Sequence, residues 1–428
     1  MNKTFDVIVV GGGTSGLMAA VQASEQGANV LLLEKNPTLG RKLLLSGGGR
    51  CNVTNRSSRD NLIKHIPGNG KFLYGPLSQF TQEDIVDFFE SNGVKLKEED
   101  HGRMFPSDDK ARSILNTFIN RMKENRVTIK TKAPVSNLIT NSSSISGVKL
   151  TNGEKFYAPC IIVSVGGKAY PRTGSTGDGY KWMKQMGHTI SPLYPTEAPL
   201  LSHDSFILNQ SLRGVSLRDV EVSVWGEKID KKPITSHQMD MIFTHFGYSG
   251  PAILRSSGHV NQFLMQTKAD KCLLTINLWP HKSLEDLQAI KIEFENQRNK
   301  QLLTLLKKWM PEKLAKVISA KCGLDSYKPY KQLTHSQIDQ LFKMIQAFPI
   351  SVYKSEPIEK GFVTGGGVIT DEIDPKTMES KIINGLYLSG ELLDINGYTG
   401  GYNITAALVT GAVAGRQAAW ASFSKTNS

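Results

Sequence analysis

The sequence is poor in cysteine, and the cysteines that it has are far apart. Cys51, Cys160, Cys272 and Cys322 form no C-x-x-C pair anywhere in the 428 residues. This spacing excludes a zinc knuckle and a thioredoxin-like dithiol, and we expect no metal site. The simplest interpretation is four reduced, mostly buried thiols.

Long hydrophobic runs are also missing. No apolar stretch approaches the roughly 20 residues that a membrane-spanning helix needs. The N-terminal apolar segment is short and runs into Gly11, Gly12 and Gly13, so it is typical of a strand and not of a signal peptide. We therefore expect a cytoplasmic protein with no membrane contact.

Acidic residues are fewer than basic ones: the sequence has 51 Lys and Arg but only 39 Asp and Glu, which gives a net charge of +12. Such an excess favours anionic partners, whether nucleotide cofactors, nucleic acid or acidic substrates. The sequence has no zinc-finger spacing and no RNP-like aromatic motif, so a nucleic-acid partner is the less favoured interpretation. The length predicts two or three domains.

The first 36 residues contain an ordered set of signals. A β-branched apolar run, residues 5–10, leads into Gly11, Gly13 and Gly16 in the pattern G-x-G-x-x-G, and small apolar residues follow. A second apolar run ends at Glu34, 18 residues after the last glycine. Strand, glycines, helix, strand and acid in this order are typical of a dinucleotide site, and a glycine-rich turn in another α/β protein is the alternative.

Each part of this pattern has a physical role. The first glycine permits the tight turn, the second lets a pyrophosphate approach the backbone, and the third lets helix and strand pack closely. The helix N-terminus binds the phosphates and the acid binds a ribose diol. The predicted contacts are Gly11, Gly13, Thr14, Ser15, Gly16, Glu34 and the adjacent Lys35. These residues do not by themselves distinguish FAD from NAD.

A second glycine-rich stretch, "RKLLLSGGGRCNVTN" at residues 41–55, follows directly after the acid. A nicotinamide dehydrogenase does not need such a loop, whereas FAD extends beyond its pyrophosphate. Backbone N–H groups without Cβ atoms can approach a phosphate or a flavin edge, and Arg50 can neutralise phosphate charge. A surface turn with a solvated arginine is the alternative. The predicted contacts are Lys42, Ser46, Gly47, Gly48, Gly49, Arg50, Cys51 and Asn52, with Cys51 filling a tight corner in preference to acting as a redox thiol.

Four stretches together resemble a known family. They are residues 40–55, "GRMFPSDDKA" at 102–111, "VGGKAYPRTGSTGDGY" at 165–180 and "GLYLSGELLDINGYTGGYNITAA" at 385–407. They are similar to the BaiN/RdsA family of NAD(P)/FAD-dependent oxidoreductases, the YhiN-type flavoproteins, which include aminoacetone-oxidase-like FAD-binding enzymes. Ser164-Val165 departs from the Ala-Thr that is frequent in flavoproteins of this class.

The resemblance implies an α/β fold. A Rossmann-type, GR2-like FAD-binding domain would be interrupted by an inserted β-rich subdomain and a helical subdomain. We place the FAD domain at 1–190 and 354–428, the β subdomain at 191–282 and 349–353, and the helical subdomain at 283–348. Short apolar runs between 127 and 167 predict a small β-meander within the FAD domain. The lysine-rich helical segment fits a solvated face better than a surface for an acidic partner.

The resemblance also implies further FAD contacts. Val135 would meet the adenine through its backbone, and residues 165–167 would pass close to the cofactor. Glu391 would bind the ribityl hydroxyls, and the start of a C-terminal helix would face the flavin pyrimidine, where its dipole stabilises negative charge. The full set is Val135, Val165, Gly166, Gly167, Gly390, Glu391, Gly401, Tyr402, Asn403 and Ile404.

Three functions remain open at this point. The family includes members described as reducing enone double bonds and others as amine oxidases, so the first hypothesis is reduction of a small unsaturated carbonyl compound by NAD(P)H through FAD. The second is an FAD-dependent amine oxidase producing hydrogen peroxide, and the third is a basic flavoprotein with a binding or regulatory role. No second G-x-G-x-x-G follows a strand, so NADH or NADPH would bind only transiently. Arg103, His245 and Tyr398 are candidate catalytic residues, and the sequence predicts no oligomeric state.

Overall fold

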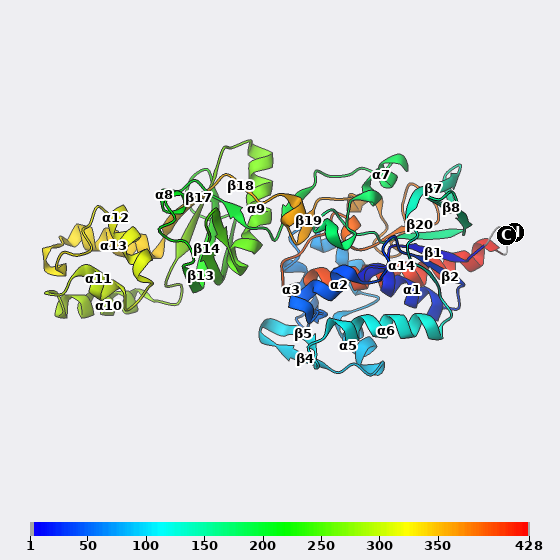
Figure 1. The fold of residues 1–428 in the computed structure, drawn as a ribbon, viewed down its shortest axis with the longest axis horizontal. Coiled ribbons are helices and arrows are strands. Elements are labelled where there is room, and N and C mark those ends of the chain that lie inside the picture. Colours follow the sequence, from blue (N-terminus) through cyan, green and yellow to red (C-terminus); the bar gives the residue numbers. More distant parts are fainter. Residues whose placement is uncertain (1–3, 427–428) are drawn as a thin grey trace. The chain divides into compact units, whose positions relative to one another are not determined.

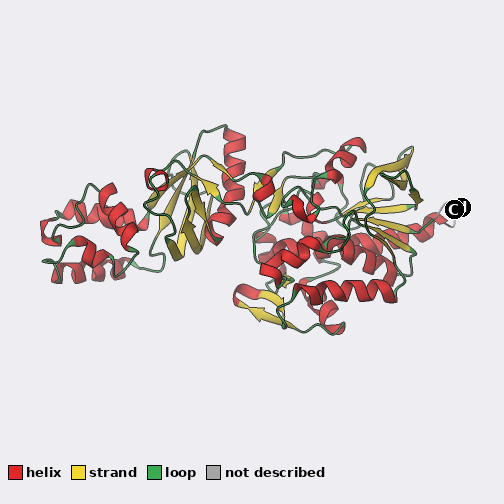
Figure 2. Ribbon diagram, in the orientation of Figure 1, coloured by secondary structure: helices red, strands yellow, loops and turns green. Residues whose placement is uncertain are grey.

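The computed structural model describes residues 4–426, which fold as two compact units. Of the described residues, unit 1 contains those up to Tyr194 and those from Val363 onwards, and unit 2 contains Pro195–Phe362. The chain crosses between them within β11 (Tyr194–Thr196) and just before β19 (Val363–Gly365). Figure 1 shows the order of the elements by colour, and Figure 2 shows the helices and strands of each unit. Within the described residues, no helix has the length and hydrophobicity to cross a bilayer.

A five-stranded parallel sheet forms the centre of unit 1. Its order is β20-β10-β1-β2-β6, so the direction of strand addition reverses between β1 and β10. Ligands in such sheets bind beyond the carboxyl ends of the strands at this reversal. Four of these short strands are buried along their whole length: β1 (Val7–Val10), β2 (Val30–Leu33), β10 (Cys160–Val163) and β20 (Leu386–Leu388). The fifth, β6 (Thr128–Lys130), is largely exposed.

Two helices from opposite ends of the sequence pack together against this sheet. They are α1 (Thr14–Glu25) and α14 (Tyr402–Thr426), blue and red in Figure 1. A Cβ atom on Gly411 would lie 2.3 Å from the carbonyl oxygen of Ser15, so only glycine permits this approach. The remaining helices of unit 1 are α2 (Arg41–Leu45), α3 (Arg59–Lys64), α4 (Tyr74–Leu77), α5 (Gln82–Ser91), α6 (Ala111–Glu124) and α7 (Asp178–Gln185).

Two small antiparallel sheets complete unit 1. One has the order β3-β5-β4 and the other β7-β8-β9. The meander expected between residues 127 and 167 is thus shorter than predicted, because its first run forms β6 and pairs in parallel with β2. The alternation of apolar and polar residues predicts a strand but does not show which sheet the strand joins. In the folded chain, the connection through α6 brings this strand beside β2. The bounds are β3 (Thr54–Asn55), β4 (Leu96–Glu99), β5 (Arg103–Pro106), β7 (Val135–Asn141), β8 (Ser144–Leu150) and β9 (Lys155–Tyr157).

Unit 2 combines a seven-stranded antiparallel sheet with helices. The strand order is β17-β16-β13-β14-β15-β12-β18, and α9 packs against β13 and β14. The sheet and the helices share one hydrophobic core. The strands are β12 (Leu200–Leu201), β13 (Ser216–Gly226), β14 (Thr235–Phe243), β15 (Gly247–Ser249), β16 (Cys272–Asn277), β17 (Phe348–Val352) and β18 (Lys354–Ser355), and the helices are α8 (Ser205–Leu208), α9 (Pro251–Thr267), α10 (Leu284–Asn296), α11 (Leu302–Leu306), α12 (Glu312–Lys321) and α13 (His335–Gln346).

Candidate functional site

The first glycine loop joins β1 to α1 at the reversal point of the sheet. A Cβ atom on Gly11 would lie 2.5 Å from the carbonyl oxygen of Ser164, which follows β10, and one on Gly16 would lie 1.9 Å from that of Gly11. These two glycines are therefore required by packing. Gly13 differs, because a Cβ atom there would meet nothing within 4 Å and its φ of −85° is accessible to any residue. The space in front of Gly13 is open.

The start of α1 offers hydrogen-bond donors to this open space. No side chain among the described residues caps the helix, and its first turn carries no acidic residue. The first N–H groups of a helix have no partner inside the helix, and the positive end of the dipole favours a negative charge beside them. Thr14 and Ser15 lie in this turn, so these two predicted phosphate contacts stand at the start of one helix, where anions are favoured.

Glu34 lies at the carboxyl end of β2 and is 8% exposed. One carboxylate oxygen accepts hydrogen bonds from the backbone N–H and the side-chain amide of Asn36, both at 2.7 Å, and the other accepts from the N–H of Gly12 at 2.8 Å. A carboxylate has about four acceptor sites, so one more hydroxyl can bind. The carbonyl of Glu34 accepts from the N–H of Ala133 at 2.9 Å, which brings the segment ahead of Val135 to the same edge. Lys35 forms an ion pair with Asp178 at 2.6 Å.

The second glycine loop is a kinked 3-10 turn at Ser46–Gly49. Gly47, Gly48 and Gly49 have φ angles of 56°, 69° and 91°, all in the left-handed region that favours glycine. A Cβ atom on Gly48 would meet nothing within 4 Å. The backbone at Gly48 is therefore accessible to a ligand, although its conformation alone already favours glycine.

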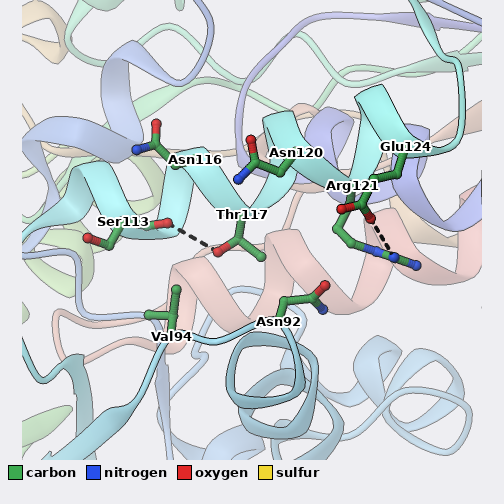
Figure 3. A pocket seen from close by; sticks show the side chains of 8 residues that line it. All are labelled: Asn92, Val94, Ser113, Asn116, Thr117, Asn120, Arg121 and Glu124. Atoms are coloured by element: carbon green, nitrogen blue, oxygen red, sulfur yellow. Dashed lines mark hydrogen bonds and ion pairs between the residues drawn. The ribbon is translucent and has the colours of Figure 1, made fainter.

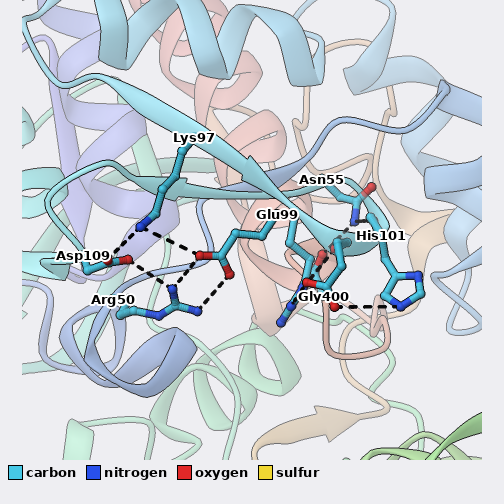
Figure 4. A network of polar contacts seen from close by, with 9 residues as sticks. Arg50, Asn55, Lys97, Glu99, His101, Asp109 and Gly400 are labelled. Carbon is cyan, nitrogen blue, oxygen red and sulfur yellow. Dashed lines mark hydrogen bonds and ion pairs between the residues drawn. The ribbon is translucent and has the colours of Figure 1, made fainter. Parts of the chain in front are cut away.

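Arg50 holds this loop against the hairpin of β4 and β5, as Figure 4 shows. Its guanidinium lies 2.7 Å from Glu99 and 3.0 Å from Asp109, and it stacks on the ring of Phe105 at 4.0 Å. Hydrogen bonding to Arg50 lowers the pKa of Glu99, which keeps the pair charged. The charge expected to neutralise a phosphate is thus already balanced within the protein, because Arg50 is held by two carboxylates. Arg50 thus anchors the loop, and its contact with the cofactor stays a prediction.

Cys51 and Asn52 link the loop to its neighbours. Cys51 is completely buried, and burial raises the pKa of its thiol to about 12, so the thiol is neutral and inaccessible. This fits the packing interpretation better than a redox role. With its amide oriented to satisfy all partners, Asn52 donates to the carbonyls of Thr54 and Met104 and accepts from the N–H of Gly401 at 2.9 Å. Asn52 therefore connects the second glycine loop to the start of α14.

A third group of predicted residues surrounds Glu391. One oxygen of Glu391 lies 2.7 Å from Nζ of Lys42, and the other accepts from the N–H of Thr364 at 2.7 Å. A Cβ atom on Gly167 would lie 2.3 Å from Oγ1 of Thr364, and one on Gly390 would lie 2.5 Å from Oγ of Ser15. These glycines permit close packing where β10 and β20 end. Gly166 has a φ of 73°, and the partly buried Val165 packs on the main core.

The segment before α14 is held by side-chain amides. Asn55 donates to the carbonyls of His101 and Gly400 at 2.9 and 3.0 Å (Figure 4). Asn403 accepts from the N–H of Gly397 at 2.8 Å and donates to its carbonyl at 2.7 Å. Gly401 has no room for a side chain, because a Cβ atom there would lie 2.7 Å from the backbone of Thr54. The start of α14 is thus fixed beside the second glycine loop, with Ile404 half-buried there.

The three catalytic candidates lie in different surroundings. Arg103 is on β5 and forms an ion pair with Asp100. Tyr398 is half-buried and its N–H donates to the carbonyl of His65 at 3.0 Å. His245 belongs to unit 2, in the turn between β14 and β15, with its ring edge-on to Phe246 at 4.9 Å.

His65 is a residue that the sequence did not single out. Its ring stacks on Tyr402, the first residue of α14, at 4.7 Å between ring centroids and 9° between planes. Nothing in the stretch "KHIPGNG" marks this histidine as functional. Only the tertiary contacts bring it to the start of α14.

A separate hollow of ≈ 290 Å³ lies on unit 1 beside α6 (Figure 3). Asn116, Asn120 and other polar residues line it, and Arg121 forms an ion pair with Glu124 on the same helix at 2.8 Å. None of the predicted cofactor contacts lines this hollow. We do not associate it with the cofactor.

The comparison with known families identifies the chain. The sequence model of the family described as "HI0933-like protein Rossmann domain" matches residues 5–417. The chain belongs to this family. The resemblance stated from the sequence motifs is thereby confirmed, and with it the enzyme class: this member of the HI0933-like family is an FAD-dependent oxidoreductase.

Two relatives match over almost their whole length. The 3-dehydro-bile acid delta(4,6)-reductase of Clostridium scindens is 30% identical over 96% of this chain and 98% of its own. The ribosomal RNA dihydrouridine synthase of Escherichia coli is 29% identical over 94% of each chain.

Solved structures of low identity share the fold. The E. coli quinol-fumarate reductase subunit FrdA has a TM-score of 0.52 at 15% identity, over 99% of this chain and 72% of its own. The 3-ketosteroid delta1-dehydrogenase of Sterolibacterium denitrificans has a TM-score of 0.51 at 14% identity, over 98% of this chain and 100% of its own. These likenesses confirm the Rossmann-type fold.

The residues of unit 1 fit FAD, the cofactor of this class. The open space at Gly13 faces the uncapped start of α1, and Glu34 retains an acceptor site for a ribose hydroxyl. FAD extends well beyond its adenosine half and so needs further contacts. The accessible backbone at Gly48 can provide one of them.

Proposed function

We propose that this protein is a reductase in which NADH or NADPH reduces FAD and a carbon–carbon double bond conjugated with a carbonyl takes up the hydride. The observation that carries the proposal is the chemistry common to the names of the two full-length relatives. One name describes reduction of double bonds in a 3-dehydro, that is 3-oxo, bile acid. The other describes formation of dihydrouridine, in which a ring double bond conjugated with a carbonyl has been reduced. Substrates as different as a steroid and a nucleobase thus share one reacting group.

We place the FAD contacts at residues of unit 1, from the adenosine end of the cofactor to the flavin. N–H groups at the start of α1 bind the pyrophosphate beside Gly13, Glu34 binds the adenosine ribose, and the backbone at Val135 meets the adenine. Lys42 and Glu391, which already pair with each other, meet the ribityl hydroxyls. The pyrimidine end of the flavin faces the start of α14, at Gly401–Ile404.

FAD, when bound, supplies hydride acceptance from the nicotinamide and hydride delivery to the substrate. The protein supplies position and electrostatics. The first N–H groups of α14 present the positive end of a long helix dipole to one edge of the site, which favours negative charge there. The network of Asn52, Asn55 and Asn403 fixes that helix start against the second glycine loop, so the donors need no reorganisation during the reaction.

Separate anaerobic half-reactions test the proposal. NADH or NADPH should bleach the visible flavin band of the purified holoprotein, and 2-cyclohexen-1-one should restore it with formation of cyclohexanone. Bleaching by small amines but by neither nicotinamide would instead establish the amine oxidase. Failure of both nicotinamides and amines to reduce the flavin would favour the binding or regulatory role.

A uracil ring within RNA is a second candidate substrate for the same chemistry. The E. coli relative is named for such a modification, and the net charge of +12 with a pI of about 9.3 favours a polyanionic partner. Transcribed ribosomal RNA fragments should then restore the flavin band and gain dihydrouridine, and the affinity should fall steeply with salt. Restoration by 2-cyclohexen-1-one without any RNA binding would favour a small-molecule substrate.

A further inference from the structure

His65 lies at the end of α3 and is half-buried. Two ring contacts and one backbone hydrogen bond tie His65 to its neighbours in unit 1. The ring is parallel to that of Tyr402 at 4.7 Å, and Tyr398 approaches it edge-on at 6.3 Å and 86°. The carbonyl of His65 also accepts from the N–H of Tyr398 at 3.0 Å. An ionisable group is thereby held in the same place as the helix start to which we assign the flavin pyrimidine.

The hydrogen bond of Nδ1 determines which nitrogen exchanges protons. Nδ1 lies 2.8 Å from the backbone carbonyl oxygen of Asn61. A carbonyl oxygen only accepts hydrogen bonds, so Nδ1 carries a proton in both charge states of the ring. Nε2 is therefore the nitrogen that gains and loses a proton.

We propose that His65 is the acid that protonates the substrate double bond, through Nε2. This inference rests on the proposed function, because it assigns the proton that reduction of a conjugated double bond requires. Tyr402 and Asn61 are positioning residues, since they orient the imidazole. His65 would thus add an acid to the pyrimidine edge of the site, where the other proposed contacts are the first N–H groups of α14.

The step balances in atoms and electrons. The β-carbon of the substrate gains a hydride from the reduced cofactor, and the π electrons move towards the carbonyl oxygen to give an enolate. The α-carbon then takes the proton from Nε2 as its new C–H bond forms. His65 is left neutral and regains a proton from water. The overall change is addition of one hydride and one proton across the double bond.

Two substitutions at His65 separate proton delivery from packing. His65→Gln retains a polar side chain, and His65→Phe retains an aromatic ring on Tyr402, but neither can donate a proton as imidazolium. Lys64→Gln, one residue away and exposed, is the matched control for loss of a basic group. Reduction by NADPH or NADH and reoxidation by 2-cyclohexen-1-one are followed separately, with FAD affinity measured by fluorescence.

We expect both His65 variants to reduce normally and to reoxidise about 100-fold more slowly, in the range typical of a lost general acid. The wild-type reoxidation rate should be lower in alkaline than in acidic buffer, because the protonated imidazole is the donor, and the variants should lose this dependence. Wild-type rates in His65→Phe would show that only stacking matters and would overturn the proposal. Loss of FAD from both variants, with FAD retained by Lys64→Gln, would reassign His65 to structure and equally overturn it.

A spectroscopic measurement tests the tautomer without turnover. Nitrogen NMR of 15N-histidine holoprotein, with the His65 signals assigned by their absence from His65→Gln, should show a protonated Nδ1 at every pH and a titrating Nε2. A neutral ring protonated at Nε2 would contradict the proposal. If wild-type protein is reduced but never reoxidised by the enone, the proposed function fails instead, and the NMR result still decides the tautomer.

Discussion

The two glycine loops of unit 1 need glycine for different reasons. In the first loop, a Cβ atom on Gly11 or Gly16 would lie within 2.5 Å of a backbone oxygen of another residue. In the second loop, Gly48 and Gly49 have positive φ angles but space for a Cβ atom. Gly13 is neither crowded nor at positive φ. The packing of the folded chain leaves space for a side chain at Gly13, and we propose that bound FAD occupies this space.

This difference separates three costs of adding a side chain. A side chain at a crowded glycine would disturb packing, and one at a positive-φ glycine would strain the backbone. A side chain at Gly13 would do neither, and we expect it to obstruct the ligand. Substitutions at one glycine of each kind should therefore affect stability and FAD binding in different proportions.

Gly16→Val should have the largest effect. Its Cβ atom would lie 1.9 Å from the carbonyl oxygen of Gly11, and backbone cannot move aside as a side chain can. We expect a loss of about 3 kcal/mol or more in the free energy of unfolding, or no folded protein. Urea unfolding of the apoprotein measures this loss, and wild-type stability would show that α1 can shift on β1.

Gly13→Val should change FAD binding with little change in stability. The side chain enters open space with an allowed φ, so we expect the apoprotein to lose no more than about 1 kcal/mol, the cost of a poorer helix cap. The purified protein should lack the yellow colour of bound flavin, because the side chain occupies the position of the pyrophosphate. Stoichiometric FAD in this variant would contradict the proposed cofactor position.

Gly48→Ala should have an intermediate effect on stability and a small one on FAD. The φ of 69° costs a non-glycine residue about 1 kcal/mol, and nothing obstructs the methyl group. Chemical denaturation and the ratio of flavin to protein absorbance measure the two quantities. A contact made through the backbone of Gly48 tolerates a methyl group, so complete loss of FAD would show that the cofactor lies too close to Gly48 for any side chain.

Arg50→Met should have the smallest effect, and the effect should depend on pH. Hydrogen bonding to Arg50 lowers the pKa of Glu99 in the folded protein, so this pair stabilises the fold above the unfolded-state pKa of the carboxylate. That stabilisation is lost as pH falls through the lowered pKa. The stability difference between wild type and Arg50→Met should therefore narrow in acid, and because both side chains are partly exposed it should be small at neutral pH. Denaturation midpoints at neutral and acidic pH provide the comparison, and a difference that widens in acid would contradict this account.

Much of the fold could be predicted from local pattern. The order of β1, the glycines, α1 and β2 follows from residues that are close in sequence, and so does the acid at Glu34. The local pattern also predicts a strand at Thr128–Lys130 but assigns it to the wrong sheet, because pairing with β2 depends on the path of α6. In the sequence Arg50 has no acidic partner nearby, so it looks like a ligand for a phosphate. The carboxylates that pair with it, Glu99 and Asp109, lie about 50 residues or more away, and only the folded chain brings them to it.

The sequence by itself determined the identity of the family and the existence of a dinucleotide loop, because these depend on short motifs whose conformations are set by glycine and by strand–helix order. The tertiary structure alone decided which charges are already paired, which glycine faces open space, and that His65 reaches the start of α14. Such facts arise from contacts between segments up to several hundred residues apart. Local backbone preference contains no information about those contacts.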